Sequence, residues 1–117
     1  MTPWFDRVFG AGEGVEFNNA AQAIIAQADL AREDEVLALF ARLDASLPRL
    51  TGLVNNAGIM SLAPIADMDS GVFERMLNIN LLGSFNTMQQ AAKHMVAGGR
   101  VINTSSSVTK LLQPTYG

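Results

Sequence analysis

Residues 50–59 read LTGLVNNAGI, and this stretch decides the fold expected for the rest of the chain. The apolar run 50–54 predicts a short buried strand, which residues 55–58, Asn-Asn-Ala-Gly, bring to an end. Small residues and a glycine let a backbone approach a flat ligand, and asparagine side chains can tie neighbouring strands together. The alternative at this point is an ordinary turn at the end of a strand.

The residues before this strand predict one further strand and one helix. Residues 23–28 are a short apolar run, which is typical of a buried strand. Residues 31–47 begin with acids, which suit the positive end of a helix, and continue with apolar residues at steps of three and four. This pattern predicts an amphipathic helix that Pro48 brings to an end.

The residues after this strand predict a second helix and a third strand. An apolar stripe runs over 72–95 and predicts the longest helix, with Asp69 or Ser70 as its cap. The glycine pair 98–99 is expected to end that helix. Residues 100–104 then predict a strand that runs into a serine cluster.

The predicted order, strand-helix-strand-helix-strand (βαβαβ), indicates a parallel sheet with right-handed crossovers. In such sheets ligands bind beyond the carboxyl ends of the strands. Polar residues follow each predicted strand at that end: Asp29, Asn55 with Asn56, and Ser105 to Ser107. The pattern alone therefore places a binding site at this edge.

Composition narrows the class of protein. The 117 residues have room for one small domain, carry a formal net charge of −3 and are 49% hydrophobic. This balance argues against a dedicated nucleic-acid binder and against docking on anionic membranes. The chain has no cysteine for disulfides or thiolate metal sites, and the lone His94, expected as a solvated partner of the helix dipole, cannot build a zinc site. With neither a membrane span nor a signal peptide in the pattern, a soluble, cytoplasmic chain is expected.

Two stretches carry a family resemblance. Residues 53–59 resemble the Asn-Asn-Ala-Gly signature of the short-chain dehydrogenase/reductase family, and 99–107 resemble its strand leading to the catalytic serine. The resemblance spans Gln22 to Gly117. It implies a partial Rossmann-like doubly wound parallel sheet that lacks the first strand, the glycine-rich loop and the second strand. It also implies NAD or NADP as cofactor and hydride transfer to or from a carbonyl or alcohol substrate.

The resemblance implies two catalytic residues. Asn80 matches the asparagine of the catalytic tetrad, which helps to hold a water in the proton relay, and Asn78 does not match. Ser106 matches the serine that orients the substrate carbonyl and stabilises charge on its oxygen. Read alone, an asparagine inside a helix usually faces solvent, and a serine cluster at a strand end is more often turn chemistry.

The resemblance also implies five cofactor-binding residues. Asp29 matches the acidic residue that contacts the adenine ring beside Leu30, although on local sequence it serves equally well as a helix cap. Asn55, Ala57 and Gly58 are expected to line the cofactor groove.

Tyr116 does not match the family's catalytic tyrosine. That tyrosine follows the serine by about thirteen residues and precedes a lysine by four in the family's pattern. Tyr116 lies ten residues after Ser106, and Lys110 precedes it. We therefore expect Tyr116 to flank a substrate loop and the catalytic tyrosine and lysine to lie beyond Gly117.

The first 20 residues differ from the rest. Gly10, Gly12 and Gly14 have the wrong spacing for the family's pyrophosphate loop and predict a flexible break. The expected division is therefore a divergent segment, 1–20, and a partial Rossmann-fold dehydrogenase domain, 21–117.

Two functional interpretations follow. In the first, the chain is a fragment of an NAD(P)-dependent oxidoreductase with a small-molecule substrate, and the helix over Val72 to Met95 supports a family-like homo-oligomer. In the second, it is a non-catalytic remnant or binding module of the same fold, inactive alone.

Overall fold

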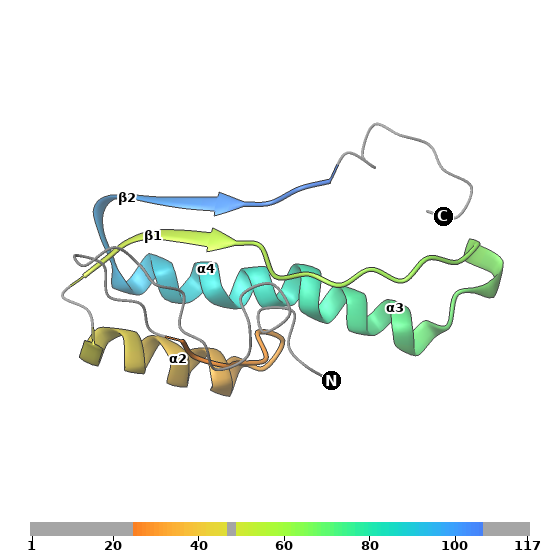
Figure 1. The fold of residues 1–117 in the computed structure, drawn as a ribbon, viewed down its shortest axis with the longest axis horizontal. Helices are drawn as coiled ribbons and strands as arrows, with labels where there is room; N and C mark the ends of the chain where they lie inside the picture. The colour runs from red at the N-terminus through yellow and green to blue at the C-terminus, as the bar shows by residue number, and fades with distance from the viewer. Residues whose placement is uncertain (1–24, 47–48, 107–117) are drawn as a thin grey trace.

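The computed structural model describes residues 25–46 and 49–106 of the chain (Figure 1). Its elements are, in order, helix α2 (Glu33–Ser46), strand β1 (Leu50–Asn55), 3₁₀ helix η1 (Ile65–Asp67), helix α3 (Ser70–Leu77), π-helix η2 (Asn78–Leu82), helix α4 (Gly83–His94) and strand β2 (Met95–Asn103). The predicted α/β class is confirmed. Helix α2 and strand β1 lie where the sequence pattern put them.

Strands β1 and β2 form a parallel pair, as predicted. Val54 lies opposite Ile102, and Asn55 lies opposite Asn103, so the two strands end level with each other. The register shifts near the start of the pair, where Gly98 has a φ of 83° that suits glycine. Because the ends are level, the residues that follow each strand meet at one edge.

The predicted strand over 23–28 is wrong for the part that the structure describes. Residues 25–28 belong to no strand, and the side chain of Ile25 is 63% exposed. A strand exists only by pairing with a neighbour, and the described sheet consists of β1 and β2 alone. Residues 22–24 lie outside the described ranges.

The long helix runs from Ser70 to His94 through α3, η2 and α4. Asp69 is its cap, and the side chain of this residue accepts a hydrogen bond from the backbone N–H of Val72 at 3.0 Å. The predicted end at the glycine pair 98–99 is wrong, because Met95 is already extended and pairs with Leu50. Pairing with β1 therefore ends the helix before the glycines do. Among the described helices, none has the length and apolar character needed to cross a membrane.

The hydrophobic core lies between α2, α4 and the sheet. Figure 1 shows α4 running along the sheet, with α2 on its far side. Val36 and Phe40 of α2 and Ala91 of α4 are at most 3% exposed. Leu30, Leu50, Leu53 and Met95 pack against them. On the opposite face of the sheet, no described element covers the side chains, and Val54 and Ile102 are 62% and 57% exposed.

Acids occupy the first turn of α2, as predicted. The hydrogen bond from Arg32 holds the pKa of Asp34 below its usual range, and that bond in turn raises the pKa of Arg32. Folding lowers the pKa of Asp34, so the ionised carboxylate stabilises the folded state. This stabilisation is fully present above the ordinary carboxyl pKa and is lost as the pH falls through the lowered pKa. Both side chains are exposed, so this contribution is small.

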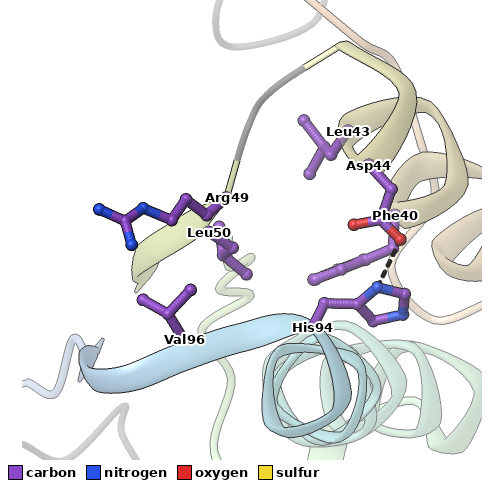
Figure 2. A pocket seen from close by; sticks show the side chains of 7 residues that line it. All are labelled: Phe40, Leu43, Asp44, Arg49, Leu50, His94 and Val96. Atoms are coloured by element: carbon purple, nitrogen blue, oxygen red, sulfur yellow. Dashed lines mark ion pairs between the residues drawn. The ribbon is translucent and has the colours of Figure 1, made fainter.

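An ion pair joins the ends of α2 and α4. Nδ1 of His94 lies 2.6 Å from Oδ2 of Asp44, and the His94 ring also tilts against Phe40 with centroids 5.6 Å apart (Figure 2). His94 therefore has a defined partner, whereas a solvated position was predicted.

We expect this pair to contribute modestly to stability, because the Asp44 side chain is 53% exposed. A double-mutant cycle of His94→Gln and Asp44→Asn, followed by urea unfolding, should give a coupling energy of about 0.5–1 kcal/mol. A coupling energy indistinguishable from zero would show that the pair does not hold the two helices together.

Candidate active site

A groove lies at the carboxyl ends of the two strands. Its volume is about 470 Å³. Its walls are the loop 55–60, the segment 104–106, and Met76, Asn80 and Ser84 from the long helix. Five of the seven predicted site residues line this groove: Asn55, Ala57, Gly58, Asn80 and Ser106. The described residues hold no cluster of acids and histidines suited to a metal ion.

Asn55 joins the elements at the base of the groove by hydrogen bonds. It is 8% exposed, and its amide N–H donates to the Asn103 side chain at 2.8 Å, which ties the ends of the two strands together. Its side-chain oxygen accepts from the Thr87 hydroxyl of α4 at 2.6 Å. Its backbone carbonyl accepts both the N–H and the hydroxyl of Thr104, at 3.0 and 3.1 Å. The Asn55 side chain thus holds β1, β2 and α4 together. The backbone of the loop that follows it lines the groove.

Asn80 joins the long helix to the loop after β1 by hydrogen bonds. Its side-chain oxygen accepts from the Ile59 N–H at 2.8 Å, and its amide donates to the Ile59 carbonyl at 2.7 Å. It lies at the centre of η2, whose wider turn is closed by the Gly83 N–H donating to the Asn78 carbonyl. Short π segments often occur at functional sites. Here the widened turn carries the residue that makes two hydrogen bonds to Ile59, just after Gly58.

Gly58 leaves room for the Asn80 side chain. A Cβ at this position would come within 3.2 Å of the Asn80 side-chain oxygen, which is tighter than ordinary packing. Its φ is not positive, so the requirement is for space and not for an unusual backbone. The sequence signal of small residues at 57–58 therefore has a physical cause.

Ser106 lies in the groove just beyond β2, together with Ser105. The anchoring of Thr104 to Asn55 fixes where this segment leaves the sheet. A hydroxyl here can donate a hydrogen bond to a carbonyl oxygen and stabilise the charge that develops on it. Ser107, Lys110 and Tyr116 lie outside the described residues.

Asp29 and Leu30 are not among the residues that line the groove. The Asp29 carboxylate accepts from the Ala31 N–H at 3.1 Å, and its own N–H donates to Glu35 at 2.6 Å, so its bonds are those of a local turn before α2. Leu30 packs on the core, and its carbonyl accepts from the Asn86 side chain at 2.9 Å. A contact of either residue with an adenine ring remains a prediction.

The sequence analysis missed Thr87 and Asn103, which hold Asn55 in place. A signal existed for Asn103, since an asparagine closes both paired strands at matching positions. Thr87 lies four residues after Gly83, on the same helical face, but nothing in the pattern distinguished it from the other polar residues of this helix.

Replacing Asn80 by alanine should release the loop. Two hydrogen bonds to Ile59 are lost at an exposed position, so stability should fall by about 1 kcal/mol, and the Ile59 amide should exchange its hydrogen about tenfold faster. Asn78→Ala is the matched control, because the Asn78 side chain makes no hydrogen bond within the described residues. Equal exchange rates at Ile59 in both variants would contradict the assigned role.

Comparison with known proteins identifies the family to which the chain is similar. Residues 13–117 match the family model described as short chain dehydrogenase. An uncharacterized oxidoreductase of Methylorubrum extorquens is 37% identical over 91% of this chain and 44% of its own length. A gluconate 5-dehydrogenase of Burkholderia cenocepacia, solved with NADP and tartrate, is 35% identical with a TM-score of 0.68, over 74% of this chain and 35% of that one. A further short chain dehydrogenase of that organism, solved with NADP, is 31% identical with a TM-score of 0.71, over 76% and 37%.

The chain thus spans less than half the length of the relatives it matches. The family match, over residues 13–117, covers nearly all of the chain and includes the groove residues described above. The chain belongs to the short-chain dehydrogenase family.

Proposed function

We propose that this chain contributes the nicotinamide side of the active site of an NAD(P)-dependent oxidoreductase acting on a small carbonyl or alcohol substrate. The observation that carries the proposal is the groove at the carboxyl ends of β1 and β2, which five predicted site residues line. Family members solved with NADP support the cofactor class. When bound, such a cofactor supplies or accepts a hydride.

The residues that line the groove suit the nicotinamide end of such a cofactor. Gly58 leaves room for the Asn80 side chain, and Asn80 is hydrogen-bonded to the adjoining backbone at Ile59. Ser106 would orient the substrate oxygen from the opposite wall. Asn80 is thus a positioning residue by its side-chain contacts, and the water-holding role implied by the resemblance is part of the proposal.

We further propose that the 117-residue polypeptide does not catalyse the reaction alone. A free phenol has a pKa near 10 and needs a neighbouring cation to act as an acid or base at neutral pH. The only lysines, Lys93 and Lys110, both precede Tyr116, so the tyrosine–lysine pair of the family's pattern cannot form within these residues. The second candidate function, a non-catalytic cofactor-binding or interaction module, rests on this observation.

Two finer expectations belong to the same proposal. Exposed Phe73, Leu77, Leu81 and Phe85 along the long helix suit a homo-oligomer built through that helix. A cytoplasmic location rests on composition.

Calorimetric titration with NADPH tests the proposal. The polypeptide should bind with a dissociation constant of about 1 mM, because only part of a cofactor site is present. Gly58→Ala should weaken binding about tenfold, since its Cβ displaces Asn80. Gly52→Ala is the control, because a Cβ there meets its nearest neighbour at an ordinary 3.9 Å. Equal affinities for the two variants would refute the assigned groove, and turnover of NADPH with a carbonyl substrate would refute the claim of inactivity.

A further inference from the structure

A second cleft lies at the opposite end of the sheet from the groove. Its volume is about 340 Å³, and it opens between the last turns of α2, the start of β1 and the junction of α4 with β2 (Figure 2). Four apolar side chains line it: Phe40, Leu43, Leu50 and Val96. In open α/β sheets the cofactor binds at the carboxyl ends of the strands, so this cleft at the amino ends belongs to a different site.

Three charged or titratable side chains complete the lining, and two of them pair with each other. His94 and Asp44 form the ion pair at 2.6 Å and lie on one side of the cleft. Arg49 lies on the other side (Figure 2) and, within residues 25–46 and 49–106, has no ion pair or hydrogen bond of its side chain. Among residues 25–46 and 49–106, Arg49 is therefore a cation of the cleft without a charged partner.

The apolar part of the lining is built from fixed elements. Phe40 is 3% exposed and held against the His94 ring, and Leu50 packs on the same core cluster. Leu43 and Val96 are half-buried on facing sides. Leu43 and Val96, which are only half-buried, would lose water contact when a hydrocarbon chain covers them, and this favours an apolar body in the ligand.

We propose that this cleft binds a small amphipathic carboxylate, with its head on Arg49 and an apolar body of a few carbons on Phe40, Leu43 and Val96. A guanidinium matches a carboxylate with two parallel hydrogen bonds, which a single ammonium does not. The cleft's volume lies in the range of small-ligand sites, which begins at about 300 Å³. The Asp44 carboxylate is engaged by His94 and lies with it on the side of the cleft away from Arg49 (Figure 2).

A titration of the full ¹⁵N-labelled chain with hexanoate tests the proposal. Saturable shift changes are expected at the amides of Leu43, Arg49 and Val96 and at the Arg49 side-chain Nε–H. Acetate, which lacks the apolar body, and hexanol, which lacks the charge, should each bind at least tenfold more weakly. These comparisons need no variant protein.

Arg49→Gln should also weaken hexanoate binding at least tenfold, and Arg75→Gln, at a distant exposed arginine on α3, should leave it unchanged. Equal binding of acetate or hexanol, an unaffected Arg49→Gln variant, or no saturable shifts at the cleft would each overturn the proposal. The amides of Gly58 and Ser105 lie in the groove, so hexanoate shifts confined to them would place the ligand there and would also overturn the proposal.

Discussion

Replacing Phe40 by alanine should destabilise the chain by about 3–4 kcal/mol, because it removes the largest side chain of the described core and leaves a cavity. Phe40 packs among Val36, Ala91 and the residues of β1 that face α4, and it also supports the His94 ring. Small domains are stable by only about 5–15 kcal/mol in total, so this loss is a large share. Urea unfolding followed by circular dichroism measures it.

Leu37→Ala is the matched control on the same helix. Leu37 is 46% exposed, so its truncation should cost less than about 1 kcal/mol. If the two variants lost similar amounts, the core would lie elsewhere, and the packing of α2 on α4 would not be what stabilises the chain.

Replacing Asn55 by aspartate should cost about 2–3 kcal/mol at neutral pH, although the two side chains have nearly the same shape. The substitution removes the N–H that donates to Asn103 and places a carboxylate at a position that is 8% exposed. The neighbouring Asn56→Asp, at an exposed position, should change stability by less than about 0.5 kcal/mol.

The pH dependence of this cost provides a second readout. Burial, and the Asn103 side-chain oxygen that would face the new carboxylate, disfavour the charged form. The new carboxyl should therefore take up a proton at a higher pH than an exposed aspartate, whose pKa is about 3.9. The difference between Asn55→Asp and the unaltered chain should then shrink as the pH falls. A difference that stays constant down to acid pH would show that the lost hydrogen bond to Asn103, and not the buried charge, accounts for the cost.

The sequence predicted the local elements well where local physics decides them. Helix α2 follows from its acids and its apolar spacing, and Asp69 caps the next helix with the side-chain bond that such residues make. The loop at 55–58 was predicted from small residues and asparagine amides, and the tie between Asn55 and Asn103 across the strands is observed. Recognising the family extended these local patterns to the fold as a whole.

The predictions that failed depend on partners distant in the sequence. An apolar run at 23–28 becomes a strand only if a neighbour offers hydrogen bonds, and the described sheet gives it none. The long helix ends at His94 because Met95 pairs with Leu50, not because glycines follow. The π segment around Asn80 accompanies its contact with Ile59, which no helical pattern reveals.

The central claim is that the groove beyond β1 and β2 receives the nicotinamide cofactor, and residue-resolved NMR of the ¹⁵N-labelled chain with NADPH tests it most directly. The account predicts saturable shift changes at the backbone amides of Asn56 to Ile59 and at Ser105 and Ser106, with a dissociation constant of about 1 mM and no change along α2. Shift changes centred on α2, or none at the groove at NADPH concentrations well above that value, would contradict it.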